Sequence, residues 1–103
     1  MVIYQVELKI ENDIAKEYLE WLTPHMEKMM SFNGFLKVDL YEDLTDKEEG
    51  NKRYTVIYHL ASEADLQAYL SGQAQAMRDE GIKLFGGRCQ ASRKVCRLKK
   101  SLS

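Results

Sequence analysis

Hydrophobic and polar residues alternate along two stretches of the chain. Apolar residues occupy every second position from Val2 to Ile10, and the same alternation recurs from Tyr54 to Leu60. Successive side chains of a β-strand point to opposite faces of the sheet, so a period of two is typical of a half-buried strand. We therefore predict a first strand from Val2 to about Ile10 and a third strand that ends near Ala61.

The sequence predicts two further strands, the second and the last. A second strand from about Phe35 to Glu42 would place Leu36, Val38 and Leu40 on one side of the sheet. The charged segment from Asp46 to Asn51 contains Gly50 and suits a hairpin loop. The last strand spans roughly Arg88 to Leu98, and its poor alternation indicates a position at the edge of the sheet.

A first helix is predicted after the opening strand. Asn12 or Asp13 can act as its N-cap, and Glu17 lies within its first turns. Apolar residues then recur at helical spacing, and these are Ile14, Tyr18, Trp21 and Leu22.

Pro24 interrupts this helical pattern. A proline disfavours the helical conformation of the preceding residue, here Thr23, but is well placed to begin a new turn. We therefore expect a break near Thr23 and a second helical segment that ends at Asn33-Gly34. The inner side of this segment would carry Met26, Met29 and Met30. We expect Trp21 and these methionines to fill the core.

A second amphipathic helix of about four turns is predicted after the third strand. The segment from Ser62 to Asp65 resembles a capping box, with Asp65 in the place of the usual Glu. Its apolar face consists of Leu66, Tyr69, Leu70, Ala74 and Met77. Gly81 and the Gly86-Gly87 pair then mark a short connection to the last strand.

The elements follow the order strand, helix, strand, strand, helix, strand. This is the ferredoxin-like βαββαβ arrangement of the α+β class. Right-handed crossovers place both helices on one face of a four-stranded antiparallel sheet with strand order 4-1-3-2. We expect a single ferredoxin-like domain over residues 1–98 and a frayed C-terminal tail over residues 99–103.

The two faces of this predicted sheet differ in composition. The helix-covered face would form the core with Tyr4, Val6, Leu8, Val38, Leu40, Val56, Tyr58 and Leu60. The open face mixes polar and apolar residues, namely Ile3, Gln5, Glu7, Lys9, Lys37, Asp39, Tyr41, Thr55, Ile57 and His59. An antiparallel sheet tolerates one wet face. Because Ile3, Tyr41 and Ile57 fit a covered surface better, we expect a homodimer that pairs through this face into a dimeric α/β barrel.

The overall charge argues against nucleic acid as the main partner. The chain of 103 residues is 45% hydrophobic and 30% charged, with a formal net charge of −1. This balance is that of an ordinary globular domain. The exception is a basic run near the C-terminus, formed by Arg88, Arg93, Lys94, Arg97, Lys99 and Lys100. It is typical of a solvated edge strand and tail.

The two cysteines do not predict a disulfide framework. Cys89 and Cys96 lie seven positions apart on one predicted strand, so they point to opposite faces. A reducing compartment, and hence a cytoplasmic location, is the expectation. We also expect no signal peptide, because the first strand begins at residue 2, and no membrane-spanning segment.

One constellation on the open face is a candidate catalytic site. His59 lies on the predicted third strand, and the hairpin places it across from Lys37 or Phe35, with Asp39 close by. Glu7 or Gln5 would lie on its other side. A histidine near a carboxylate can act as a general base, so His59, Asp39, Tyr41 and Glu7 are the candidate residues. The alternative, which a mixed-polarity sheet face favours, is that His59 is a structural histidine hydrogen-bonded in the dimer interface.

Other chemistries have little support in the sequence. His25 follows Pro24 and is expected to be solvated. Two separated histidines and two cysteines on opposite faces give no metal-ligand spacing, so no metal is expected. Gly86-Gly87 precedes a strand rather than a helix, which disfavours a phosphate-binding loop, and no cofactor is predicted.

The chain also resembles a family of uncharacterised bacterial proteins, domain-of-unknown-function family 4286. The matching residues are the opening Met1-Val2-Ile3-Tyr4 with Val6, Glu20-Trp21-Leu22 with His25, Tyr54, Val56 and Tyr58, Leu66 with Tyr69-Leu70, and Phe85-Gly86. This resemblance implies a ferredoxin-like fold and a dimeric α/β barrel. It implies no activity, because the family has no assigned function.

Three classes of function remain open. The first is a homodimeric module that binds a small organic ligand or serves as an interaction scaffold. The second is a cofactor-independent enzyme, monooxygenase-like or isomerase-like, with a site around His59; this rests on analogy of fold. The third is nucleic-acid or regulatory binding through the basic last strand.

Overall fold

Four antiparallel strands form one sheet in the order β2-β3-β1-β4. The computed structural model describes residues 1–45 and 49–103. The strands are β1 (Val2–Glu11), β2 (Phe35–Glu42), β3 (Asn51–Leu60) and β4 (Cys89–Arg97). Both central strands are those with the clearest alternation in the sequence, β1 and β3. The predicted α+β fold and its strand order are confirmed.

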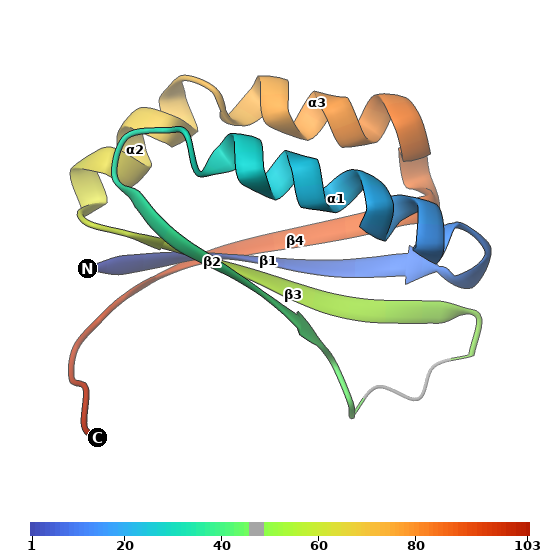
Figure 1. Ribbon diagram of the computed structural model, residues 1–103, viewed down its shortest axis with the longest axis horizontal. Helices are drawn as coiled ribbons and strands as arrows, with labels where there is room; N and C mark the ends of the chain where they lie inside the picture. Colours follow the sequence, from blue (N-terminus) through green and yellow to red (C-terminus); the bar gives the residue numbers. More distant parts are fainter. Residues whose placement is uncertain (46–48) are drawn as a thin grey trace.

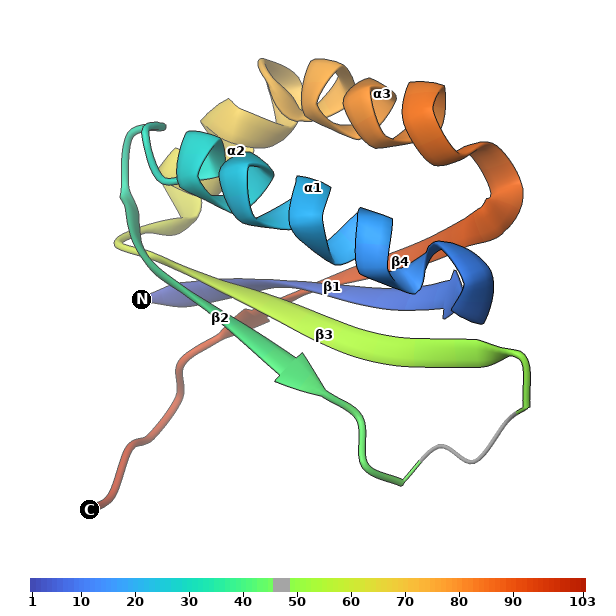
Figure 2. The ribbon, with the colours of Figure 1, turned by 45° about the vertical axis from the view of Figure 1, so that its right-hand side comes forward.

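The helices lie together on one face of this sheet (Figure 1). They are α1 (Ala15–Met29), α2 (Glu63–Ser71) and α3 (Ala74–Phe85), with short 3₁₀ turns η1 (Asn12–Ile14) and η2 (Gly86–Arg88). Figure 2 shows the same two layers from a second direction, with α1 and α3 side by side above the strands. In the part of the chain that the structure describes, no helix is long and apolar enough to cross a membrane.

The core lies between the two layers. Its fully or largely buried residues are Val2, Tyr4, Leu8, Ile10, Ile14, Ala15, Tyr18, Leu22, Met29, Phe35, Val56, Tyr58, Leu60, Leu66, Tyr69, Ala74 and Met77. The register of β1 against β3 pairs Tyr4 with Tyr58 and Val6 with Val56, so both strands present their apolar residues to the helices. Most of the predicted core residues of β1 and β3 are thereby confirmed.

The predicted break in the first helix is wrong. Helix α1 continues through Pro24, which stands inside it. Tyr18 and Leu22 before the proline and Met29 after it are all buried. Burial of one continuous apolar face outweighs the backbone hydrogen bond that a proline removes. The predicted side-chain cap is also wrong, because the 3₁₀ turn η1 precedes α1 and no side chain caps it.

The second predicted helix is divided into α2 and α3. Gly72 follows α2 with a non-helical backbone (φ −108°, ψ −87°), and the chain resumes as α3 at Ala74. The start of α2 agrees with the prediction, because Ser62 Oγ accepts a hydrogen bond of 3.1 Å from the backbone N–H of Asp65. Both helices contribute to the core, α2 with Leu66 and Tyr69 and α3 with Ala74 and Met77.

A bulge changes which residues of β2 face the core. The register against β3 shifts between Phe35 and Lys37. Phe35 is therefore 7% exposed, whereas Leu36, predicted on the covered face, is 53% exposed. Beyond the bulge, Lys37 and Asp39 face the open side as expected.

Strand β4 is an edge strand, as its weak alternation predicted. After it, the backbone N–H of Leu98 donates a 3.0 Å hydrogen bond to the carbonyl of Met1. The residues that follow have no regular secondary structure and extend away from the two layers (Figure 2). Residues 46–48 of the predicted hairpin loop lie outside the described residues.

Candidate functional site

A half-open cavity of about 90 Å³ lies between the helix layer and the sheet. Its walls are largely aromatic, with Tyr4, Tyr18, Trp21, Tyr58 and Tyr69. Well-packed cores leave few voids larger than a water molecule. A space lined by several rings and open at its rim is therefore the first candidate for a binding site.

The amphipathic pattern of α1 and the pairing of β1 with β3 position these rings. Tyr18, Trp21 and His25 are spaced by three and four residues along α1, which places them on one side of the helix. Tyr4 and Tyr58 are cross-strand partners, and their rings stack with centroids 6.1 Å apart. Together with Tyr69 of α2, these rings come from four separate elements and line one space.

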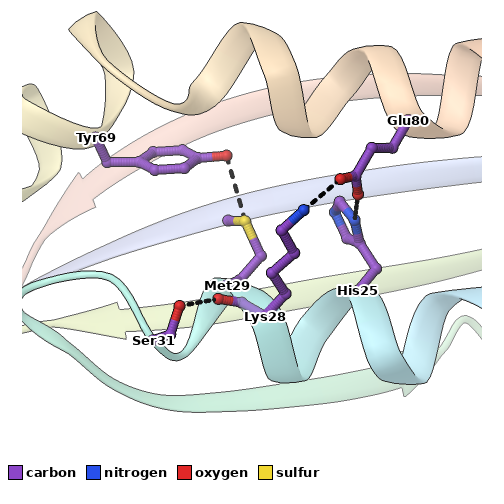
Figure 3. Close-up of polar contacts among 6 residues, drawn as sticks. All are labelled: His25, Lys28, Met29, Ser31, Tyr69 and Glu80. Atoms are coloured by element: carbon purple, nitrogen blue, oxygen red, sulfur yellow. Dashed lines mark hydrogen bonds and ion pairs between the residues drawn. The ribbon is translucent and has the colours of Figure 1, made fainter.

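His25 lies in this cavity wall. Its ring stacks on that of Trp21 with centroids 4.5 Å apart, and its side chain is 13% exposed. Its Nδ1 lies 3.4 Å from Oε2 of Glu80 on α3, whose Oε1 is 2.5 Å from Nζ of Lys28 (Figure 3). The prediction that His25 is solvated is wrong. Its spacing of four residues from Trp21 was the signal that could have placed it.

The surroundings of His25 favour its neutral form. Burial lowers the pKa of the imidazole, and the contact with Glu80 offsets part of this effect. The hydrogen bond from Lys28 lowers the pKa of the Glu80 carboxyl, so Glu80 is ionised near neutral pH. A neutral imidazole beside an ionised carboxylate is able to accept a proton.

Tyr18, Tyr58, Tyr69 and Cys89 in the wall are held in their protonated forms. Burial raises the pKa of Tyr18 and of Tyr58 far above the ordinary range, and raises the pKa of Tyr69 to about 12. Burial also raises the pKa of the Cys89 thiol, despite its hydrogen bond with Tyr18. The Tyr69 hydroxyl lies 3.3 Å from Met29 Sδ (Figure 3). These groups can bind a ligand but are not activated nucleophiles.

Two arginines complete the cavity lining. Arg78 Nη2 donates a 3.2 Å hydrogen bond to the Tyr4 hydroxyl. Its Nε is buried and has no hydrogen-bond partner among the described residues. Arg93 comes from β4, where it is paired with Val6 and so lies on the helix-covered side.

The open face holds the residues predicted as a site. His59 Nε2 is 3.3 Å from Oδ2 of Asp39, and Nζ of Lys37 is 3.4 Å from the same oxygen. The pairing of His59 with Lys37 agrees with the prediction. On β1, however, the partner of His59 is Ile3 rather than Glu7 or Gln5. The structure thus brings His59 and Asp39 together.

Glu7 and Tyr41 lie farther along the sheet. Both are register partners of Thr55, four residues from His59 along β3. Glu7 accepts a 3.0 Å hydrogen bond from Gln5 Nε2. The strands therefore divide the four predicted residues between two places, because pairing fixes neighbours only within about one rung of the ladder.

A second hollow, of about 290 Å³, lies near Glu7, and His59 is not among the residues that line it. It is lined by Glu7, Leu8, Lys9, Arg53, Gln90, Ala91 and Ser92. Its walls are mainly long polar side chains at the sheet surface, whereas the aromatic cavity has buried walls. We take the aromatic cavity as the better-formed site, although its volume is smaller.

Part of the basic run near the C-terminus pairs with the chain's own acids. Arg88 forms ion pairs with Glu11 and Asp13, and Arg97 pairs with Glu63 of α2. These contacts leave fewer cations for phosphate groups. Within the described residues, no three histidine, cysteine or acidic side chains gather as metal ligands.

Comparisons with known proteins agree with this description of the fold. A family model described as a domain of unknown function, DUF4286, matches residues 1–99. The resemblance read from the sequence is thereby confirmed. The comparison with curated proteins gave no match.

Solved structures of similar fold include those of several natural proteins. A Deinococcus radiodurans protein, provisionally described as an antibiotic biosynthesis monooxygenase, is 15% identical with a TM-score of 0.76, over 100% of this chain and 97% of that one. SnoaB, a cofactor-independent oxygenase from Streptomyces nogalater, is 10% identical with a TM-score of 0.69, over 98% and 96%. The haem degrader MhuD from Mycobacterium tuberculosis is 20% identical with a TM-score of 0.61, over 98% and 99%. Such low identities show a shared fold and leave the activity to be argued from the site.

Proposed function

The chain belongs to the DUF4286 family, and we propose that it binds a small organic ligand in the cavity between its helices and sheet. One observation carries this proposal: a cavity with aromatic walls and polar groups lies between the helices and the sheet, where a small domain gains most from a tightly packed core. Filling the space with apolar side chains would add stability. Retaining a histidine and an arginine there instead is typical of a binding site.

Trp21 offers a direct test of ligand binding, because it is the single tryptophan of the chain and lines the cavity. Its fluorescence is titrated with a panel of small aromatic amides, alcohols and acids. We expect at least one compound to shift the emission with saturation. Val6→Phe, which narrows the cavity, should abolish the shift, whereas Leu84→Phe on the exposed side of α3 should retain it. A flat response to the whole panel, together with unchanged melting temperatures, would contradict the proposal.

A second candidate function, that of a cofactor-independent enzyme, is favoured by the His25–Glu80 pair. A neutral imidazole oriented by an ionised carboxylate can take a proton from an acidic C–H or O–H group of a bound ligand. The resulting imidazolium would be stabilised by Glu80. Return of the proton to another atom of the ligand would be an isomerisation, and electron transfer from the ligand anion to O₂ would begin an oxygenation.

Hydrogen exchange in D₂O separates the enzyme from the binding module. For a compound that binds, an acidic C–H group should exchange faster in the presence of the protein, as followed by NMR. His25→Gln should abolish this acceleration and leave binding within about threefold, whereas His59→Gln should leave both unchanged. If His59→Gln alone removed the acceleration, the catalytic base would be on the open face.

We also propose that two copies pair through the open face of the sheet. Ile3 and Ile57 are half-buried there and Tyr41 is 54% exposed, which leaves an apolar strip between charged residues. The His59–Asp39 pair would then lie inside the interface as a hydrogen-bonded contact. A cytoplasmic location fits the two free thiols of Cys89 and Cys96.

A further inference from the structure

We infer that the ligand of the interlayer cavity is a small aromatic carboxylate, whose negative charge binds to Arg78 and Arg93 while its ring packs against the aromatic walls. This inference rests on the proposed binding function and specifies the ligand class. It follows from the charge balance of the cavity, from the unmet hydrogen bonding of Arg78 and from the position of Arg93.

The charged residues that line the cavity are all positive. Among the described residues that line it, Arg78 and Arg93 are cationic and His25 can accept a proton, but none is an aspartate or glutamate. The Arg78 guanidinium is partly buried, whereas Arg93 reaches the cavity from an exposed position, and a buried charge without a counter-charge is unfavourable. An anionic ligand would supply the missing charge.

Arg78 has an unused donor. One of its Nη atoms binds the Tyr4 hydroxyl, while Nε is buried without a partner among the described residues. The acidic residues that follow it on α3 are engaged elsewhere: Asp79 accepts from Gln75, and Glu80 binds Lys28 and His25. A buried donor without a partner costs free energy that a ligand oxygen would recover.

Arg93 differs from the other basic residues around it. Arg88 and Arg97 form ion pairs with acids of the same chain, and Lys94 lies 3.9 Å from Glu7 on the opposite side of β4. Arg93 forms no ion pair with any described residue and lies on the helix-covered side instead. Arg78 and Arg93 both line the cavity, and both lower the pKa of the Tyr69 hydroxyl against the larger effect of burial.

The walls and the volume define the rest of the ligand. The rings of Trp21, Tyr18 and Tyr58 provide flat surfaces on which an aromatic ring can stack or pack edge to face. The cavity of about 90 Å³ is small beside typical ligand pockets, which limits an occupant to about one ring and excludes a porphyrin. A planar carboxylate matches the fork of a guanidinium group.

The test compares 4-hydroxybenzoate with its uncharged analogue 4-hydroxybenzamide. Binding is followed by the indole N–H resonance of Trp21 and by calorimetry. We expect the carboxylate to bind about tenfold more tightly than the amide, because a charge-assisted hydrogen bond is about twice as strong as a neutral one. Added salt should weaken the binding of the carboxylate more than that of the amide.

Matched variants locate the charge recognition. Arg93→Gln and Arg78→Gln should each reduce the preference for the carboxylate to about threefold or less. Lys94→Gln on the other side of β4 and Lys83→Gln on α3 remove the same charge and should retain it. If Arg78→Gln fails to fold, Arg93→Gln still decides the question, because Arg93 is exposed on an edge strand.

The outcomes separate this inference from the proposed function. Equal binding of both compounds, or a preference unchanged in the arginine variants, would overturn the carboxylate assignment and leave the binding function intact. If neither compound moved the Trp21 resonance, and the wider panel also failed, the binding function itself would fall and the carboxylate assignment with it. A preference lost only in the arginine variants would establish both.

Discussion

A histidine lies beside a carboxylate on each side of the sheet, on the strands of the open face and between the helices that cover the other face, and the two pairs are in different surroundings. On the open face, His59 lies 3.3 Å from Asp39 with 29% of its side chain exposed. On the covered face, His25 lies 3.4 Å from Glu80 and is packed against Trp21 at the wall of a cavity. The two histidine–carboxylate distances are therefore nearly equal, but only the His25–Glu80 pair lies beside a cavity in which a ligand could react.

The origin of each pair explains the difference. His59 and Asp39 come from adjacent strands of one hairpin, so their approach needs only strand register. His25 and Glu80 are 55 residues apart, and they meet only because α1 and α3 pack on the same face of the sheet. The packing of two helices also excludes water from the His25–Glu80 pair and surrounds it with aromatic side chains. The open face of the sheet provides neither.

The largest difference between the faces should appear in stability. Leu60 on β3 is fully buried under the helices, so Leu60→Ala should lower the free energy of unfolding by about 2–5 kcal/mol. Ile57→Ala, three positions earlier on the open face, should cost less than half as much in a dilute sample. Urea denaturation measures both. Equal losses would mean that the open face is packed as tightly as the core.

The next prediction concerns the proposed dimer contact on the open face. Ile57→Asp places a charge in the proposed interface and should convert the protein from dimer to monomer at tens of micromolar, because an unpaired charge there is costly to bury. Sedimentation equilibrium gives the mass directly. Leu84→Asp, on the exposed side of α3, is the matched control and should leave the dimer intact. A wild-type monomer under these conditions would rule out the proposed assembly.

A smaller effect concerns the pH dependence of stability. Burial lowers the pKa of His25 below its unfolded value, so on acidification the unfolded chain takes up this proton before the folded one does. The free energy of unfolding should therefore decrease as the pH is lowered through 6.5, the ordinary pKa of histidine, and should be recovered above it. His25→Gln should flatten this slope, whereas His59→Gln should leave the His25 contribution in place. Denaturation curves at several pH values provide the measurement, and an unchanged slope in His25→Gln would contradict the burial of this imidazole.

The smallest effect is expected outside both faces. Deletion of residues 99–103 removes no buried residue and should change the melting temperature by no more than a few degrees. Calorimetry of the truncated and full chains tests this. A large decrease would show that the tail contributes to stability through packing, for example against a second copy.

The sequence by itself determined the features that depend on neighbours along the chain or across a hairpin. Alternation predicted the central strands, Ser62 and Asp65 predicted the start of α2, and the hairpin register placed His59 beside Asp39. Strand periodicity and capping are local, so the residues that create them are also those that reveal them.

Only the tertiary structure decided the features that depend on packing between distant segments. The continuous helix through Pro24, the division between α2 and α3 at Gly72, and the turning of Leu36 toward solvent all serve the fit of the helix layer to the sheet. The aromatic cavity has the same origin, because His25, Arg78 and Arg93 come from three separate elements. Local patterns say which side of an element is apolar, but the space left between two layers depends on how all their side chains pack together.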